Sequence, residues 1–365
     1  MRHRRACPSI DRRYWTSRAD RGYLPRPAGG AGSRRASWRW LPLLLCATLT
    51  WLLLGCAPPA GQGGPARPTP PTAPSAVAGA FPLTVTDDSG RTVTIAGEPR
   101  RIVSLAPSNT EVLFALGLGE RVVAVTTFCD FPEEAKGKAK VGGMTPNLEA
   151  IVAQAPDLVL GVRGTPPNVT AALEAQHVPL LILNPADFSA VLANIRMVGQ
   201  VTGAVDQADH LANTMQQRWN AVAERARTAP SKPRVMFEID ASDPTSITAA
   251  GPGTFIDAMI TAAGGINVVA GMTPGQQYPK LSAEAILQAD PELIILGNAA
   301  FGQSLETVTR RPGWGAMGAV QRRAVVAITE PDVVSRPGPR LVDGLDLVAR
   351  AIHPELFGAP APQAS

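Results

Sequence analysis

One phrase of the sequence occurs twice, once in each half of the chain. Residues 147–161 read NLEAIVAQAPDLVLG, and residues 282–297 read SAEAILQADPELIILG. Glu149 aligns with Glu284, and each copy has a helix-like run that ends near a proline and is followed by a short apolar run. Solenoid repeats recur roughly every 20 to 50 residues, a much shorter period than the one that separates these two glutamates. The spacing therefore predicts a chain built as two similar lobes.

Strand-like and helix-like segments alternate in both halves of the chain. Short apolar runs at 101–106, 121–126 and 179–184 are separated by helical patterns, and the second half repeats this order. Such alternation predicts parallel sheets that are covered by helices on both faces. A hairpin is expected at 83–95, around Asp88-Ser89-Gly90. Ser108 and Glu111 have capping-box spacing, which predicts the start of a helix.

A long amphipathic helix is expected between the two halves. Residues 204–228 carry apolar side chains at helical spacing from Val205 to Ala226. At 1.5 Å per residue, this helix would be about 37 Å long. A single helical crossing should restrict the two lobes to small relative motions.

The N-terminal segment up to Cys56 has the features of a lipoprotein signal. A basic segment precedes the apolar run WLPLLLCATLTWLLLGC at 40–56, whose ending resembles a bacterial lipobox. Cleavage before Cys56 and lipidation of its thiol are therefore expected, with an uncleaved anchor as the alternative. Residues 57–80 hold seven prolines and one charged residue, a composition typical of a tether.

The expected organisation follows from these patterns. The fold class is α/β, with two similar lobes of parallel sheets covered by helices, joined by one long rigid helix. The segments are a signal peptide (1–55), a tether (56–80), an N-terminal lobe (81–203), the connecting helix (204–229), a C-terminal lobe (230–358) and a tail (359–365).

Charge and motif content exclude several functions. The net charge is +4, but the segment 1–40 carries 11 Arg and 2 Asp, so the remainder stands at −5 and offers no basic face for nucleic acid. The sequence has no GxSxG motif and no P-loop, and His177, His210 and His353 are far apart. We therefore expect no enzyme activity, no cofactor and no metal site. Cys129 is expected to be a small buried hydrophobe.

The repeated glutamates have two interpretations. Asn147 and Ser282 each precede a glutamate by two positions and are N-cap candidates, which places Glu149 and Glu284 in the first turns of matching helices. An acid there favours the helix macrodipole. Alternatively, one exposed carboxylate on each lobe could dock arginines of a partner protein.

Residues 101–161 then resemble a known family. The blocks SLAPSNTEVLFALG, CDFPEEA and NLEAIVAQAPDLVLG are similar to those of substrate-binding proteins for ABC importers of cobalamin and iron–siderophores, and are most like the cobalamin branch. The resemblance covers about residues 83–358. It implies two lobes that hold a ligand between them and one glutamate on each lobe, Glu149 and Glu284, that meets arginines of the permease.

The same resemblance implies which residues bind the ligand. They comprise two aromatic positions that suit a flat macrocycle, a polar pair facing the cleft, and an asparagine near the start of a helix: Phe128, Tyr278, Asp332, Arg336 and Asn109. A core position for Phe128 and a surface ion pair for Asp332 and Arg336 are the alternatives. Gly143 and Val162 stand where some cobalamin binders carry aromatic residues.

The sequence thus predicts a monomeric, extracytoplasmic solute-binding lipoprotein, anchored to the membrane through Cys56. It would capture cobalamin or a related corrinoid and deliver it to the permease and ATPase of an ABC importer. A ferric siderophore or haem-like chelate is the alternative ligand. An envelope scaffold lipoprotein and a two-lobed hydrolase or chelatase are the alternative classes of protein.

Overall fold

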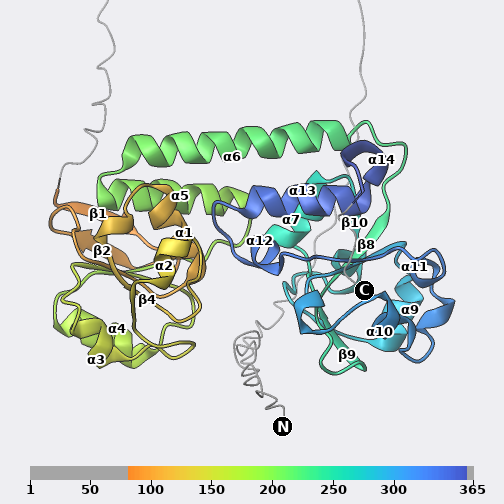
Figure 1. The fold of residues 1–365 in the computed structure, drawn as a ribbon, viewed down its shortest axis with the longest axis horizontal. Coiled ribbons are helices and arrows are strands. Elements are labelled where there is room, and N and C mark those ends of the chain that lie inside the picture. Colours follow the sequence, from red (N-terminus) through yellow and green to blue (C-terminus); the bar gives the residue numbers. More distant parts are fainter. Residues whose placement is uncertain (1–80, 360–365) are drawn as a thin grey trace, which may run out of the picture. The chain divides into compact units, whose positions relative to one another are not determined.

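The computed structural model describes residues 81–359, which form two α/β lobes linked by long helices (Figure 1). The expected signal peptide, Cys56, the tether and all but the first residue of the expected tail lie outside the described residues. The chain enters the N-terminal lobe through the predicted hairpin, β1 (Leu83–Thr86) paired antiparallel with β2 (Thr92–Ile95). Asp87 fixes the hairpin turn, because its carboxylate accepts hydrogen bonds from the Ser89 hydroxyl (2.6 Å) and the Arg91 backbone N–H (3.0 Å).

The sheet of the N-terminal lobe has five parallel strands in the order β5-β4-β3-β6-β7. In chain order they are β3 (Ile102–Ser104), β4 (Val122–Val125), β5 (Ala139–Lys140), β6 (Leu158–Gly161) and β7 (Leu180–Ile182). β3 and β6 are buried along their whole length, as central strands covered on both faces must be. The connecting elements are α1 (Pro107–Ala115), the 3-10 turn η2 (Gly119–Arg121), α2 (Glu133–Lys136), α3 (Leu148–Val152) and α4 (Pro167–Ala175).

The predicted capping box at the start of α1 is wrong. The helix begins two residues earlier than expected, at Pro107, and its N-cap residue Ala106 makes no side-chain hydrogen bond. Proline suits this first helical position because it lacks the N–H that would otherwise be unpaired there. The Glu111 carboxylate is consequently not needed at the helix start, and it contacts arginines of the other lobe instead.

The sheet of the C-terminal lobe is mixed, which differs from the expected all-parallel sheet. Its order is β11-β9-β8-β12-β13, with β10 also paired to β8. The strands are β8 (Arg234–Asp240), β9 (Ser246–Ala249), β10 (Ile266–Asn267), β11 (Lys280–Ser282), β12 (Leu293–Leu296) and β13 (Val325–Ala327). β9 pairs antiparallel with β8 and β11. Only a short turn at 241–245 joins β8 to β9, and a connection that short permits antiparallel pairing only.

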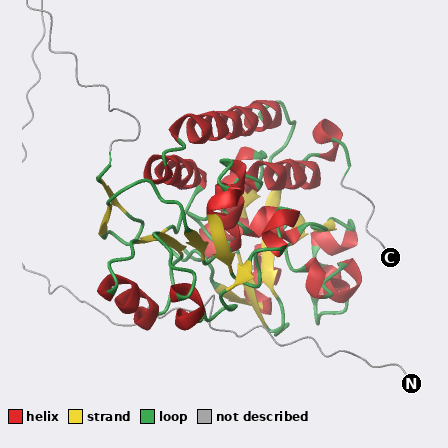
Figure 2. Cartoon of the chain, turned by 60° about the vertical axis from the view of Figure 1, so that its left-hand side comes forward, coloured by secondary structure: helices red, strands yellow, loops and turns green. Residues whose placement is uncertain are grey.

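Helices surround both sheets (Figure 2). In the C-terminal lobe they are α7 (Phe255–Ala262), α8 (Val268–Met272), α9 (Ala283–Ala289), α10 (Leu305–Thr309), α11 (Gly318–Gln321), α12 (Pro331–Ser335), α13 (Leu341–Ile352) and α14 (Pro354–Phe357), with 3-10 turns η3 (Ala299–Phe301) and η4 (Trp314–Ala316). A buried ion pair lies within this lobe, where Arg311 donates to both oxygens of Glu238 at 2.6 and 2.8 Å. Asn298 also donates to Glu238, at 3.0 Å, so the buried carboxylate has three hydrogen bonds.

The long helix predicted at 204–228 is α6 (Val205–Ala226). It packs against α5 (Phe188–Thr202) of the N-terminal lobe and against α13 of the C-terminal lobe (Figure 1). Ion pairs join α6 to each: Arg196 of α5 to Asp209 at 3.1 Å, and Arg218 to Asp343 of α13 at 2.8 Å. Both lobes are therefore fixed to the same helix.

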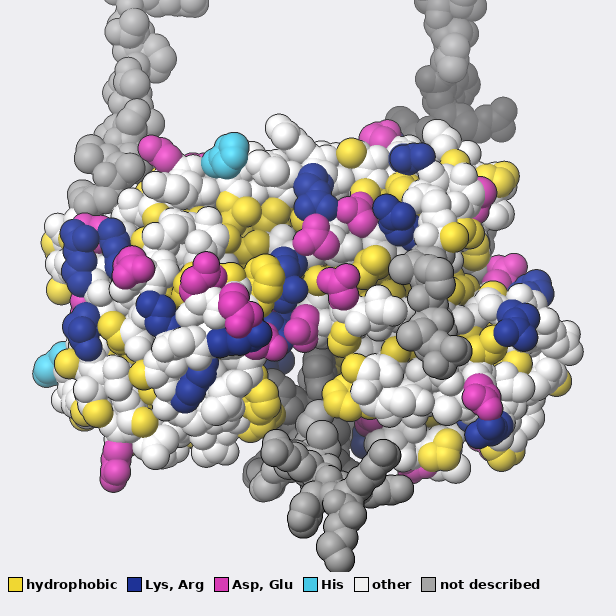
Figure 3. Space-filling model, in the orientation of Figure 1, with side chains coloured by type: hydrophobic (Ala, Val, Ile, Leu, Met, Phe, Trp, Pro, Cys, Tyr) yellow, Lys and Arg dark blue, Asp and Glu magenta, His cyan; other side chains and the backbone are white. Residues whose placement is uncertain are grey.

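The surface of the described region is mixed in charge. On the face drawn in Figure 3, acidic and basic side chains are interspersed, and no broad basic patch is visible. Within residues 81–359, no helix has both the length and the apolar character required to cross a bilayer.

Candidate functional site

The loops after the parallel strands carry the candidate site. In an α/β sheet, ligands bind beyond the carboxyl ends of the strands. Phe128 follows β4, and Arg163 follows β6. In the C-terminal lobe, Arg336 follows α12, which itself follows β13. Arg336 forms an ion pair with Asp130, in the loop after β4, at 2.7 Å. Loops at the carboxyl ends of the two sheets are therefore in direct contact.

A cluster of charges joins the lobes at this contact. Glu111 of α1 has a side chain that is 1% exposed, and it accepts hydrogen bonds from Arg340 at 2.6 and 2.9 Å and from Arg336 at 3.1 Å. Hydrogen bonding to Glu111 raises the pKa of Arg340 above its usual value. Burial acts to lower the pKa of Arg336, but the carboxylates of Asp130, Asp332 and Glu111 outweigh it and raise that pKa. Both arginines are thus held as cations.

The predicted polar pair belongs to this cluster. Asp332 and Arg336 form the i,i+4 ion pair at 2.8 Å, but the Arg336 side chain is only 13% exposed and also contacts the N-terminal lobe. The Asp332–Arg336 pair is therefore part of the contact between the lobes, and not an isolated surface ion pair. Ligand contact by these two residues stays a prediction. Asp130 and Arg340 were not among the predicted site residues: Asp130 belongs to the CDFPEEA block, but the pairing of both residues across the lobes depends on partners far away in the chain.

The predicted aromatic residues are placed on different lobes. Phe128 is 48% exposed, so it is not a core aromatic. Its ring lies beside Gly143, where an added Cβ would come within 3.5 Å of the ring. Tyr278 precedes β11 and is half-buried. Burial raises the pKa of Tyr278 to about 12, and the positive charge of Arg163 acts in the opposite direction. The phenol is therefore neutral at physiological pH.

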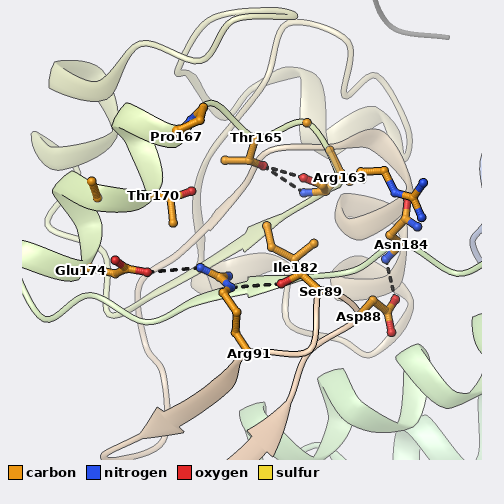
Figure 4. A pocket seen from close by; sticks show the side chains of 13 residues that line it. Asp88, Ser89, Arg91, Arg163, Thr165, Pro167, Thr170, Glu174, Ile182 and Asn184 are labelled. Carbon is orange, nitrogen blue, oxygen red and sulfur yellow. Dashed lines mark hydrogen bonds and ion pairs between the residues drawn. The ribbon is translucent and has the colours of Figure 1, made fainter. Parts of the chain in front are cut away.

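Arg163, the residue that acts on this pKa, belongs to the loop after β6 of the other lobe. The sequence analysis missed Arg163, although it noted Val162 next to it. Arg163 lines a pocket of about 540 Å³ in the N-terminal lobe (Figure 4). The hairpin turn, the loop after β6, α4 and the segment after β7 surround this pocket.

Asn109 is buried, with 3% of its surface exposed. Its amide donates a hydrogen bond to the carbonyl of Gly161, the last residue of β6, at 2.9 Å. In this structure Asn109 therefore fixes the end of β6, just before the loop that carries Arg163. A direct contact with ligand stays a prediction.

The repeated glutamates occupy matching places in the two lobes. Glu149 and Glu284 are exposed and lie in the first turns of α3 and α9. The predicted N-caps are confirmed, because Asn147 accepts from the Ala150 N–H at 3.1 Å and Ser282 accepts from the Ala285 N–H at 3.2 Å. Hydrogen bonds from its own backbone N–H and from Ser282 lower the pKa of Glu284. Permease docking stays a prediction.

Other sequence expectations concern metal and thiol chemistry. No group of three or more His, Cys, Asp or Glu side chains in residues 81–359 is arranged to hold a metal ion. His177 and His210 are exposed, whereas His353 is buried and hydrogen-bonded to Glu355 at 2.9 Å. Cys129 is 1% exposed and lies in the core, which confirms its interpretation as a small buried hydrophobe.

Comparisons with known proteins agree with this architecture. Residues 102–331 match the family model described as periplasmic binding protein. An uncharacterized ABC transporter substrate-binding lipoprotein of Bacillus subtilis is 34% identical over 322 residues, covering 87% of this chain and 97% of that one. A cobalamin-binding protein of Halobacterium salinarum is 30% identical over 286 residues, covering 75% and 74% of the two chains.

Solved structures share the fold as well. A periplasmic haem-binding protein from Roseiflexus superposes with a TM-score of 0.62 at 30% identity, covering 70% of this chain and 98% of that one. These relatives are solute-binding proteins rather than enzymes, which confirms the expectation of a non-enzyme. The chain therefore belongs to the periplasmic binding protein family.

Proposed function

We propose that this solute-binding component of an ABC transporter captures cobalamin or a related corrinoid between its lobes and delivers it to an importer. The observation that carries the proposal is the similarity to the cobalamin-binding protein of Halobacterium salinarum, which extends along both lobes. The role as the substrate-binding component of an ABC transporter rests on the family match and on the Bacillus subtilis relative.

The chemistry of the candidate site supports a flat, largely apolar ligand. Phe128 presents an exposed ring from the N-terminal lobe, and Tyr278 presents a half-buried ring from the C-terminal lobe. Aromatic faces of this kind can cover a macrocycle from two sides. Gly143, next to the Phe128 ring, leaves space where a larger side chain would contact it.

Haem is the main alternative ligand, because a structural relative is a haem-binding protein. Haem iron in proteins is commonly held by His, Cys, Met or Tyr. The three histidines of the described region lie on α6, after α4 and before α14, in none of the loops that carry the candidate site. This placement favours a corrinoid, whose axial cobalt positions are filled by its own groups, over a haem, whose iron takes an axial ligand from the protein.

Two further parts of the proposal concern delivery. We infer that Glu149 and Glu284, one exposed carboxylate on each lobe, dock arginines of the permease through charge-assisted hydrogen bonds. We also propose that lipidation at Cys56 anchors the protein to the outer side of the cell membrane, with residues 57–80 as the spacer. The lipoprotein name of the Bacillus subtilis relative supports the anchor.

Calorimetric titration tests the ligand. Purified residues 57–365 would be titrated with cyanocobalamin, dicyanocobinamide, haemin and ferrichrome under identical conditions. We expect saturable one-to-one binding of at least one corrinoid, tighter than that of haemin or ferrichrome. Binding of haemin or ferrichrome without corrinoid binding would replace the proposed ligand while retaining the transport role.

A further inference from the structure

The pocket that contains Arg163 belongs entirely to the N-terminal lobe. Its wall includes Asp88 and Arg91 from the hairpin, Val162–Thr165 from the loop after β6, and Thr170 and Glu174 from α4. A volume of about 540 Å³ is within the usual range for small-molecule sites. Figure 4 shows Glu174 at one end of the pocket and Arg163 with Asn184 at the other.

The charged groups of the pocket differ in how they are paired. Arg91 forms ion pairs with Asp87 at 2.9 Å and with Glu174 at 3.4 Å. Arg163 contacts a neutral group instead: with the Asn184 amide oriented to accept, its Nε and Nη2 lie 3.2 and 2.9 Å from the amide oxygen. No carboxylate in the described part of the chain forms an ion pair with Arg163. Its charge is therefore available to a ligand.

The groups around Arg163 are fixed from behind. The Asp88 carboxylate accepts from the Asn184 backbone N–H at 2.5 Å and from the Asn194 amide at 2.7 Å. The loop itself is closed by Thr165, whose hydroxyl donates to the Val162 carbonyl at 2.8 Å. The partner Asn184 and the loop that carries Arg163 therefore need little rearrangement when an anion binds, which favours affinity.

The location of Arg163 links this pocket to the candidate ligand site. Arg163 lies two residues after Gly161, the end of β6, whose carbonyl accepts from the Asn109 amide at 2.9 Å, so its loop is at the carboxyl edge of the sheet, where the candidate site lies. At the interface between the lobes, by contrast, Arg336 and Arg340 are already engaged by Glu111 and Asp130. Those two arginines cannot take an anion without giving up these partners.

We propose that this pocket receives an anionic arm of the bound ligand and that Arg163 is the residue that binds its phosphate or carboxylate. The inference rests on the proposed function, because it assumes a ligand between the lobes. On a cobalamin the group is the phosphate of the nucleotide loop; on a haem it is a propionate. Glu174 lies at the opposite end of the pocket, and the Asp88 carboxylate at the Arg163 end is occupied by hydrogen bonds from Asn184 and Asn194, so Arg163 is the charged group there that is available to an anion.

Cobalamin and cobinamide provide the test, since cobinamide lacks the nucleotide loop and its phosphate. We expect Arg163→Gln to weaken cyanocobalamin binding about tenfold, the worth of one charge-assisted hydrogen bond, and to change dicyanocobinamide binding less than about twofold. Arg163→Lys should recover part of the loss because it restores the charge. Arg100→Gln is the control, since Arg100 is an exposed arginine that precedes β3, at the other end of the same sheet.

The outcomes separate the inference from the proposed function. If the wild type binds corrinoids and Arg163→Gln weakens both of them equally, or neither, the anion site is disproved while the function stands. If the wild type binds haemin and no corrinoid, the function fails, and a haemin-specific loss in Arg163→Gln would still support the anion site. Thermal unfolding of each variant shows that the fold is retained.

Discussion

Arg336 and Glu111 form an ion pair at 3.1 Å although they belong to different lobes and lie 225 residues apart. Arg340 adds two hydrogen bonds to the same carboxylate and places its guanidinium 3.9 Å from the centre of the Phe131 ring. Glu111 is thus the point where two arginines of one lobe meet the other lobe. Its carboxylate fixes how the loops around the candidate site face each other.

Removing the Glu111 charge should therefore destabilise the protein. Glu111→Gln leaves two partly buried arginines without their shared carboxylate, and we expect the free energy of unfolding to fall by about 3 kcal/mol. Urea denaturation followed by circular dichroism measures it. Glu133→Gln is the control, because the Glu133–Lys136 pair on α2 is exposed to solvent and should contribute little to stability. Equal losses in the two variants would contradict the structural role of Glu111.

Asp87 in the hairpin turn should make the stability of the fold depend on pH in the acid range. Burial acts to raise the pKa of Asp87, but hydrogen bonds from Ser89, Arg91 and Ile182 outweigh it and hold the pKa below its ordinary value of 3.8. A carboxyl group whose pKa is lowered in the folded state stabilises the fold at pH values above its ordinary pKa. This contribution is lost as the pH falls through the folded-state pKa.

Asp87→Asn should therefore be less stable than the wild type at pH 7, and the difference should shrink as pH is lowered below 3.8. Urea denaturation across this pH range measures the difference. Asp206→Asn, a change at an exposed position of α6, is the control. A difference that is independent of pH would show that Asp87 acts through shape rather than charge.

The packing of α5 on α6 predicts a stability change at Gly199. A Cβ at this position would lie 2.3 Å from the Cβ of Ala208, so Gly199→Ala must push the two helices apart. Overpacking of this kind costs about 1–3 kcal/mol. Gly271→Ala on α8 is the matched control, because no atom lies within 4 Å of its added Cβ, and it should be neutral or slightly stabilising. Calorimetric melting temperatures distinguish the two.

The aromatic residue of the C-terminal lobe should contribute to ligand affinity. Tyr278→Ala is expected to weaken corrinoid binding about tenfold, which corresponds to about 1.4 kcal/mol and is in the range of an aromatic contact. Tyr278→Phe keeps the ring and should bind nearly as well as the wild type. Titration calorimetry with cyanocobalamin or dicyanocobinamide measures both. Unchanged affinity in Tyr278→Ala would place the ligand elsewhere.

The glutamate pair should matter for transport and not for ligand binding. Glu149→Ala/Glu284→Ala is expected to bind corrinoid like the wild type but to lose stimulation of the permease ATPase in liposomes, because two charge-assisted contacts are removed. The control is Glu133→Ala/Glu306→Ala, which removes one exposed first-turn glutamate from each lobe at other sites. Full stimulation by the first double variant would leave Glu149 and Glu284 as helix-start residues only.

The sequence determined those features that local pattern specifies. The hairpin at 83–95, the long helix α6 and the N-caps of α3 and α9 all depend on residues within a few positions of each other, so they can be recognised from the chain alone. The repeat placed Glu149 and Glu284 in equivalent, exposed first turns for the same reason. Buried apolar strands between helices were sufficient to predict two α/β lobes.

The tertiary structure alone decided which distant residues meet. Glu111 fits a capping box by spacing, yet its carboxylate binds two arginines of the other lobe. Arg163 carries no local signal, and its importance depends on Asn184 being brought beside it and on the pocket that the surrounding elements form. The antiparallel β9 and β11 likewise follow from a short connection and from pairing across the sheet. Backbone pattern fixes elements, whereas ion pairs and pockets depend on how those elements pack, because side chains of opposite charge attract whatever their separation in sequence.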